Sequence, residues 1–155
     1  MWFPPSHGAP EGRRHGSTGV CVTTEGQVVV VSEGSGWGLP GGRPEGEEGW
    51  RETLDREVWE EACAVVEDAR LIGFAQGTCL RGHEEGLVLV RSLWVATVRL
   101  EPWAPEFETV ERDVLEPGEA LERLLRFDPN PALLRMFREA FPGLVDGVFD
   151  GGSTT

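Results

Sequence analysis

Apolar residues along this chain follow two spacings, and each spacing predicts a different kind of element. Short runs of β-branched and aromatic residues, bounded by Gly, Pro and polar clusters, are typical of strands. The run at residues 27–31 (QVVVV) is continuous, which indicates a strand buried on both faces. By these criteria we expect strands at residues 17–22, 27–31, 69–75, 87–100 and 107–115.

The expected strands also suggest their partners. Residues 17–22 and 27–31 flank a Glu25-Gly26 turn, which favours a hairpin. The polar segment 81–86 separates the next two strands, which we expect to pair antiparallel. Because it is the longest β-rich run, 87–100 is the expected centre of the sheet.

Other segments repeat apolar residues every three or four positions, as amphipathic helices do. Leu54, Val58 and Ala62 share one face of a helix that begins near Trp50. Strands around such a helix predict an α/β protein with a mixed central sheet between helices.

The last third of the chain has the pattern of two more helices. We expect them at residues 117–126 and 131–141. Asp128 or Asn130 is the expected cap of the second, with Pro131 in its first turn.

The helix that begins near Trp50 has an acidic face. Glu57, Glu60 and Glu61 are spaced i, i+3 and i+4, so their side chains meet. Each like-charged pair costs an isolated helix about 0.2–0.5 kcal/mol, so the cluster indicates a cation among the carboxylates. Because no His lies near, the cluster favours a hard, oxygen-seeking ion, Mg²⁺ or Mn²⁺.

The residues from Gly41 to Ala64 resemble the Nudix box, the signature of MutT-like pyrophosphohydrolases. That pattern is Gly, five residues, Glu, seven residues, then Arg-Glu-apolar-any-Glu-Glu-any-Gly-apolar. Cys63 departs from it, since the family has Gly there to close the helix, and we expect the helix to end differently. The pattern is matched by Gly42, Glu48, Arg56, Glu57, Glu60 and Glu61.

The Nudix resemblance implies a fold and an activity. The fold is an α/β/α sandwich with a mixed central sheet, and the order of elements extends the likeness over residues 14–141. The activity is hydrolysis of a phosphoanhydride bond in a nucleoside di- or triphosphate derivative, a small-molecule partner. A catalyst of that reaction neutralises phosphate charge, holds the leaving group and activates water. Relatives are often dimers, so a homodimer is a further expectation.

The resemblance also assigns roles. Divalent metal is held by the glutamates Glu57, Glu60 and Glu61 together with a backbone carbonyl, which belongs to Gly42 or equally to Gly41. Glu57 has the alternative role of orienting the attacking water. Arg56 pairs with Glu48 and braces the loop, although Glu48 has the alternative role of a metal ligand, and we group Arg56 with the three glutamates as catalytic. The general base and the number of metal ions stay open.

Substrate contacts are less marked. Arg14, Trp37, Arg43 and Glu108 are the candidates, because they combine cationic, stacking and loop-borne acidic groups near the box. The segment 77–81 has neither the Pro nor the Tyr that marks some Nudix subclasses, so the nucleotide is not identified. Further loop clusters are His83, Glu84 and Glu85, and Glu108 with Glu111.

Composition narrows the class of protein. The 155 residues carry a formal charge of −13, which argues against stable nucleic-acid binding. No signal peptide or membrane-length apolar run is present, so we expect a cytoplasmic protein. The three cysteines lie too far apart in the sequence for a zinc-binding motif, and we expect them to be reduced thiols. The expected organisation is a flexible N-terminal arm at 1–12, a Nudix hydrolase domain at 13–143 and a C-terminal tail at 144–155.

Two other functions are weighed against the hydrolase. One is a non-catalytic Nudix-fold module that binds a nucleotide or sugar nucleotide; such modules typically lose box glutamates, and none is lost here. The other is an acidic interaction protein without a small-molecule site, which the spacing of the box residues argues against.

Overall fold

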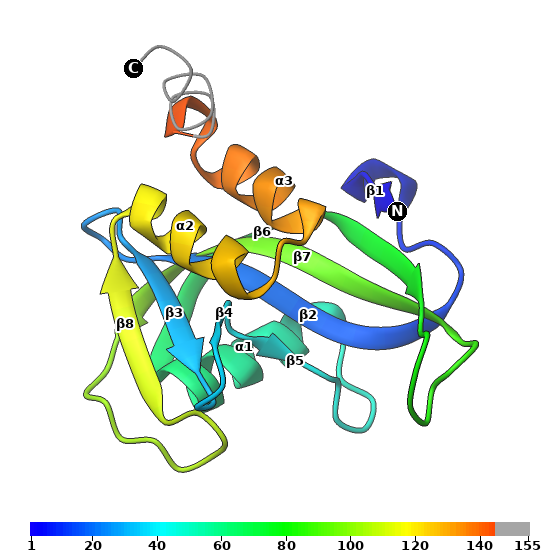
Figure 1. The fold of residues 1–155 in the computed structure, drawn as a ribbon, viewed down its shortest axis with the longest axis horizontal. Coiled ribbons are helices and arrows are strands. Elements are labelled where there is room, and N and C mark those ends of the chain that lie inside the picture. Colours follow the sequence, from blue (N-terminus) through cyan, green and yellow to red (C-terminus); the bar gives the residue numbers. More distant parts are fainter. Residues whose placement is uncertain (145–155) are drawn as a thin grey trace.

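The computed structural model describes residues 1–144, and these residues form one mixed sheet between helices (Figure 1). The strands are β1 (Trp2–Phe3), β2 (Arg13–Val22), β3 (Val28–Ser32), β4 (Trp37–Gly38), β5 (Gly41–Gly42), β6 (Ala64–Thr78), β7 (Val88–Leu100) and β8 (Glu111–Leu115). The helices are the short 3-10 helix η1 (Pro5–His7), α1 (Trp50–Ala62), α2 (Pro117–Phe127) and α3 (Pro131–Ala140).

The main path of the sheet has the order β1-β6-β7-β2-β3-β4, with β5 paired to β2 and β8 paired to β3. Strands β6 and β7 are antiparallel from Ala64↔Leu100 to Thr78↔Val88. Strands β2 and β7 are parallel, so the sheet is mixed, and β7 lies at its centre. The predicted α/β class and the central position of 87–100 are therefore confirmed.

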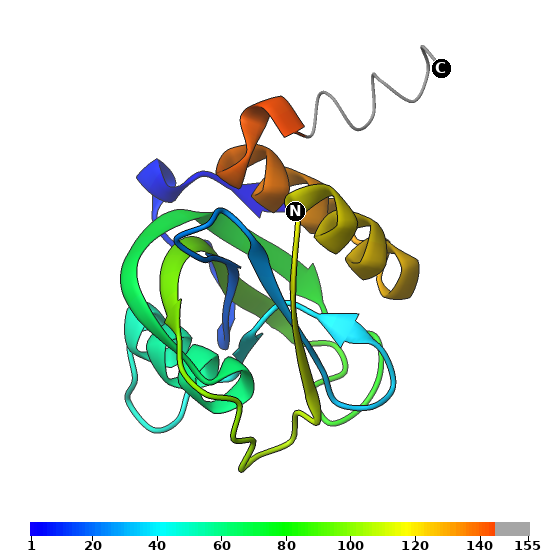
Figure 2. The ribbon, with the colours of Figure 1, turned by 90° about the vertical axis from the view of Figure 1, so that its left-hand side faces the viewer.

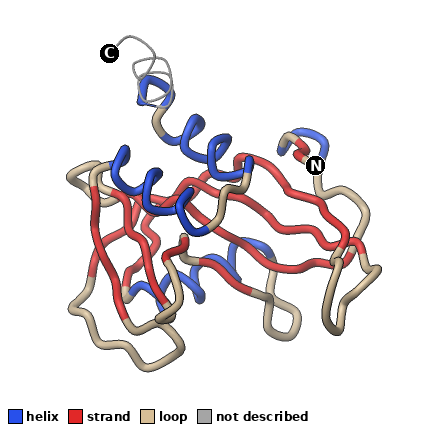
Figure 3. Tube along the Cα trace, viewed as in Figure 1, coloured by secondary structure: helices blue, strands red, loops and turns tan. Residues whose placement is uncertain are grey.

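Helices cover both faces of the sheet, with α1 on one side and α2 and α3 on the other (Figures 2 and 3). Strand β3 shows how the sequence builds these layers. Val28 and Val30 pack with α2 and α3, whereas Val29 and Val31 pack with α1. The side chains of a strand alternate between faces, so a continuous valine run supplies both cores at once.

Several strands differ from their predicted bounds because their partners are distant in sequence. Strand β6 is longer than the expected 69–75, since it pairs along the whole of β7. The expected 17–22/27–31 hairpin pairs antiparallel at Val22↔Val28, and the rest of β2 lies beside β7 instead. The glycines of β5, expected as a turn, pair with Ser17 and Thr18.

The first residues of the chain differ from the expected flexible arm. Strand β1 pairs with β6, placing Trp2 opposite Ala75. A Cβ on Gly73 would lie 2.5 Å from the indole of Trp2, so the ring packs closely on a position without a side chain. The arm has no periodic pattern and its partner strand is about 70 residues away, so local sequence carried no sign of this pairing. The expected tail at 144–155 lies outside the described residues, apart from Leu144.

Helix α1 ends at Ala62, and Cys63 stands at the position of the box glycine. Cys63 has φ = 51° and ψ = 49°, the left-handed conformation that glycine adopts most easily, and its N–H bonds the carbonyl of Trp59. The expectation that the helix would end differently is therefore wrong, because the cysteine takes up the conformation of the glycine.

Smaller expectations have mixed outcomes. Asn130 is the cap of α3, since its side chain accepts a hydrogen bond from the N–H of Ala132 at 2.9 Å. Cys21 and Cys63 are buried free thiols, whereas the free thiol Cys79 is partly exposed. Among residues 1–144, no helix has the length and apolar character needed to cross a membrane.

Candidate metal and substrate site

Helix α1 presents its acidic residues on the side away from the core. Leu54, Val58 and Ala62 are fully buried against the sheet, which fixes the rotation of the helix. The side chains of Glu57 and Glu60 remain 14% and 21% exposed, so they are held at the surface of the domain with access to solvent.

The guanidinium of Arg56 lies among these carboxylates. Its Nε and Nη2 donate to the two oxygens of Glu48 at 2.7 and 3.1 Å, a bidentate pair. Its Nη1 donates to Glu57 at 2.9 Å and to Glu60 at 3.0 Å, and its Nη2 donates to the carbonyl of Arg43 at 2.7 Å. Arg56 therefore ties the loop before the helix to the acidic face. It is also a cation that offsets the repulsion between Glu57 and Glu60.

Glu48 and Arg56 strengthen each other's charged states. The hydrogen bonds from Arg56 lower the pKa of Glu48 to about 2, against a smaller opposing effect of burial. In turn, the Glu48 carboxylate raises the pKa of Arg56. The pair is ionised at every physiological pH.

Glu61 has a different environment. Its Oε1 accepts a hydrogen bond from the N–H of Gly41 at 2.8 Å. The pKa of Glu61 is raised to about 7, chiefly by burial and in smaller part by the charge of Glu57, although the Gly41 bond acts in the opposite direction. Burial also raises the pKa of Glu57. Both carboxylates are thus poorly solvated, a state that a bound cation relieves.

The glycines of β5 are required by these close contacts. A Cβ on Gly42 would lie 2.5 Å from the carboxyl carbon of Glu57. A Cβ on Gly41 would lie 2.5 Å from the carbonyl oxygen of Ser17. At Gly41 the backbone of β5 therefore lies against β2 as only glycine allows, and it brings backbone groups beside the carboxylates.

The donor atoms at this site suit a hard cation, although they are not arranged as a finished coordination shell. In the part of the chain that the structure describes, no three His, Cys, Asp or Glu side chains are gathered as metal ligands. Glu57 and Glu60 turn toward Arg56, and Glu61 turns toward Gly41. All candidate donors are oxygens, the set that Mg²⁺ and Mn²⁺ prefer.

Three cavities extend from the acidic helix across the α2–α3 side of the molecule. The first, of about 350 Å³, is lined by Glu61, Gly41 and Trp37. The second, of about 320 Å³, shares Trp37 and Leu39 with the first. The third, of about 600 Å³, shares Arg91 and Asn130 with the second. Together they offer a continuous surface large enough for a nucleotide-sized ligand.

The predicted substrate residues do not all lie on this surface. Trp37 does, and the guanidinium of Arg123 stacks on its ring at 4.9 Å. Arg14 lies 4.5 Å from the ring of Trp50 and donates to the carbonyl of Glu48, on the side of the box loop.

Loop residues beside the helix take varied places. Arg43 pairs with Glu84 at 2.7 Å. Glu108 is exposed, and its charge contributes to raising the pKa of Glu61. His83, Glu85 and Glu111 are exposed as well.

Sequence reasoning missed the residues that line the second and third cavities, above all Arg91. The sequence held one sign, because Arg91 interrupts the apolar run of β7 (VLVRSLWV). A charged residue in the middle of a central strand faces either a partner or a cavity. Asn130 was recognised as a helix cap, and its second place, in the cavity lining, depends on the tertiary fold.

The structure is thus an α/β/α sandwich that carries an arginine-braced acidic helix beside a glycine strand. A family model described as NUDIX domain matches residues 13–136. The chain therefore belongs to the Nudix family, whose hydrolases act on phosphoanhydride bonds. Nudix hydrolases generally need divalent metal ions.

Solved structures agree with this fold. A NUDIX hydrolase from Nitrosomonas europaea is similar with a TM-score of 0.67 and 17% identity, over 86% of this chain and 90% of that one. A pyrophosphohydrolase from Bacillus subtilis has a TM-score of 0.68 and 24% identity, over 91% and 90%. A MutT protein from Bacillus halodurans has a TM-score of 0.59 and 24% identity, over 72% of each chain. Among curated proteins, no sequence matches the chain.

Proposed function

We propose that this protein is a pyrophosphohydrolase that cleaves a phosphoanhydride bond of a nucleoside di- or triphosphate derivative, with Mg²⁺ or Mn²⁺ held by Glu57, Glu60 and Glu61. The observation that carries the proposal is the contact of two carboxylates of α1 with the glycine strand, Glu61 with Gly41 and Glu57 with Gly42. Glu60 lies beside them, joined to Glu57 through Arg56. Two of the three have a raised pKa through burial, so metal binding removes an electrostatic cost.

The bound ion would neutralise phosphate charge and lower the pKa of a water molecule. The protein's own groups prepare the site for it. Arg56 orients Glu57 and Glu60 while it holds the loop through Glu48. The N–H of Gly41 orients Glu61, and a carbonyl of Gly41 or Gly42 is the proposed backbone ligand. Glu57 has the alternative role of orienting the attacking water.

The apolar lining of the second cavity suits the base of a nucleotide. Leu39, Leu93 and Met136 surround it together with the ring of Trp37, so a flat base would bury its faces there. Nucleotides with different bases are candidates, since apolar contacts recognise the shape of a base and not its pattern of hydrogen-bond donors and acceptors.

The test is the substitution Glu60→Gln, which keeps the size of the side chain and removes its charge. We expect weaker Mg²⁺ binding by calorimetry and a decrease of the hydrolysis rate by orders of magnitude on a panel of nucleotides and nucleotide sugars. Arg99→Gln is the control, because Arg99 is an exposed residue of β7 paired with Glu67 and Glu101. Unchanged metal affinity in Glu60→Gln contradicts the ligand assignment. Absence of turnover by the wild type on every substrate, with either metal, contradicts the enzyme and favours the non-catalytic binding module.

A further inference from the structure

The 600 Å³ cavity has a charge opposite to that of the protein. The cationic side chains in its lining are Arg91 and Arg135, the titratable ones are His15 and Cys79, and no Asp or Glu within residues 1–144 lines it. The whole chain carries a formal charge of −13, so an acid-free cavity of this size is unexpected. Burial and the charge of Arg91 lower the pKa of His15, so the cations of the lining at neutral pH are the two arginines and the N-terminal ammonium of Met1, which donates to the carbonyl of Gln76 at 2.7 Å.

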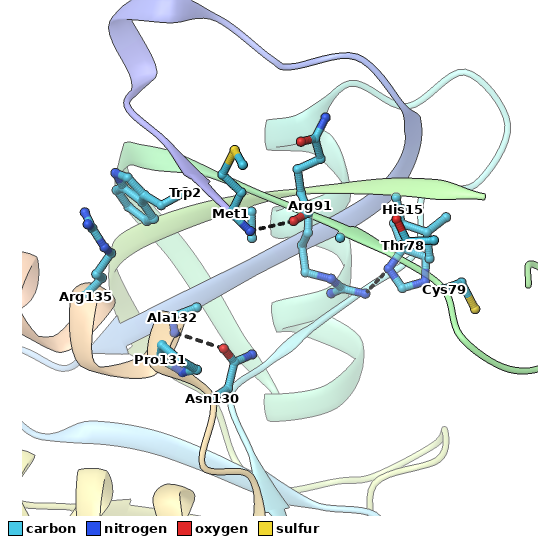
Figure 4. Close-up of a pocket in the computed structure, with 14 residues that line it drawn as sticks. Met1, Trp2, His15, Thr78, Cys79, Arg91, Asn130, Pro131, Ala132 and Arg135 are labelled. Carbon is cyan, nitrogen blue, oxygen red and sulfur yellow. Dashed lines mark hydrogen bonds between the residues drawn. The ribbon is translucent and has the colours of Figure 1, made fainter. Parts of the chain in front are cut away.

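Arg91 holds the central position in this cavity. Figure 4 shows its guanidinium between Asn130 and His15. Its Nη1 donates to the hydroxyl of Thr18 at 2.8 Å, and its Nη2 bonds Nδ1 of His15 at 3.2 Å. These neutral contacts fix the orientation of the guanidinium.

Arg91 has no carboxylate partner within the described residues, and its Nε has no acceptor among them. Burial lowers its pKa, while the more distant charges of Glu57 and Glu61 act in the opposite direction. A cation bound to Glu57 and Glu61 would cancel the effect of their charges on the pKa of Arg91. A desolvated arginine with free donors on its fork is then suited to a bidentate anion.

The position of Arg91 relative to the acidic helix suggests what that anion belongs to. The apolar second cavity separates the Glu61 cavity from the 600 Å³ cavity, and Arg91 lines both the second cavity and the 600 Å³ cavity. A nucleotide whose anhydride lies at Glu61 and whose base or sugar fills the middle cavity would direct its far side toward Arg91.

We propose that the 600 Å³ cavity binds a second phosphate of the substrate, carried on the nucleoside away from the anhydride that is cleaved, and that Arg91 selects for it. This inference rests on the proposed function, since it names the class of nucleotide that the same site takes. The phosphate oxygens accept from Nε and Nη2 of Arg91. Arg135, whose guanidinium lies 5.1 Å from the ring of Trp2, adds a second positive charge at the cavity wall.

The test compares ligands that differ by that one phosphate and are not hydrolysed. Calorimetry measures the binding of adenosine and guanosine 5′-monophosphates, and of their 3′,5′- and 2′,5′-bisphosphates, to the full-length protein. We expect one bisphosphate isomer to bind about tenfold more tightly than the monophosphate, or more. The preference persists in EDTA, because Arg91 is not a metal ligand.

Substitutions assign the preference to the cavity. Arg91→Gln abolishes it, Arg135→Gln reduces it, and Arg91→Lys retains part of it, because lysine keeps the charge and loses the fork. Arg99→Gln, on the same strand but exposed, leaves it unchanged. If Arg91→Gln fails to fold, as judged by circular dichroism, Arg91→Lys and Arg135→Gln carry the test.

Three outcomes overturn the inference. In the first, the wild type binds mono- and bisphosphates alike. In the second, the Arg91 variants weaken both ligands equally, so Arg91 contacts the base or the 5′-phosphate. In the third, inorganic phosphate occupies the cavity and leaves bisphosphate binding unaltered. Failure of the hydrolase proposal is separate, since it appears as absence of turnover whether or not the bisphosphate preference is found.

Discussion

At the scale of single residues, Cys63 shows a local cost that the fold imposes. A non-glycine residue in the left-handed region costs about 1 kcal/mol or more relative to glycine. Two long-range contacts hold the backbone there, since the Cys63 carbonyl accepts from the N–H of Glu101 at 2.9 Å and from Nη1 of Arg112 at 3.2 Å. The surrounding structure therefore decides the conformation at this position against the preference of the side chain.

This strain predicts a difference between two substitutions at one position. Cys63→Ala and Cys63→Gly both remove the buried thiol, but only glycine relieves the backbone at φ = 51°. We expect Cys63→Gly to have a free energy of unfolding about 1 kcal/mol higher than that of Cys63→Ala, measured by urea denaturation. Equal stabilities would mean that Cys63 is not strained.

At the scale of elements, the acidic face of α1 is stabilised by an internal cation. The sequence predicted repulsion among Glu57, Glu60 and Glu61, and a metal as its remedy. In the structure Arg56 bonds two of the three carboxylates, so the metal-free helix is less frustrated than the charge pattern implies. Glu61 alone depends on a backbone N–H, and it is the one whose pKa reaches about 7.

The Glu48–Arg56 pair predicts a pH-dependent stability. Because the pKa of Glu48 in the folded protein is about 2, below its ordinary value of 4.5, its contribution is complete above pH 4.5 and is lost as the pH falls toward 2. We expect Glu48→Gln to be less stable than the wild type by about 1–2 kcal/mol at about pH 7, and by less at about pH 3. Urea denaturation at the two pH values measures both gaps.

Glu47→Gln is the matched control, since Glu47 is an exposed neighbour with no ion pair in the described residues. A gap between wild type and Glu48→Gln that stays constant from neutral to acid pH would show that Arg56 does not shift the titration of Glu48.

At the scale of the whole molecule, the N-terminal residues belong to the fold. Trp2 packs on Gly73 of β6 and below Arg135 of α3, so it joins the sheet to the last helix. Its ring is also part of the cavity that contains Arg91. The first residues therefore help to shape a surface that they share with α3, although α3 lies at the other end of the described sequence.

This docking predicts that Trp2→Ala lowers the free energy of unfolding by about 1–3 kcal/mol, through the loss of its buried surface. Mg²⁺ affinity should stay the same, because α1 packs on the other face of the sheet. Ser6→Ala, an exposed change in η1, is the control. Stability within about 0.5 kcal/mol of the wild type would restore the interpretation of a flexible arm.

Much of the molecule follows from local pattern. Leu54, Val58 and Ala62 predicted the buried face of α1, and the run Val28–Val31 predicted a strand buried on both sides; both are confirmed. The position of the acidic residues on α1 also follows from periodicity. What local pattern missed is nonlocal pairing: β1 on β6, the full length of β6, and the bonding of β5 to β2. Each depends on a partner strand far along the chain.

The sequence by itself determined the class of fold, the acidic helix and the Nudix resemblance, because these rest on periodicity and on spacing within about 25 residues. Only the tertiary structure decided which carboxylates Arg56 binds, how deeply Glu61 is buried, and that Arg91 faces a cavity without acids. The physical reason is the same in each case. The desolvation of a side chain, the close approach of two groups and the sharing of a cavity are set by residues that come into contact only in the folded protein.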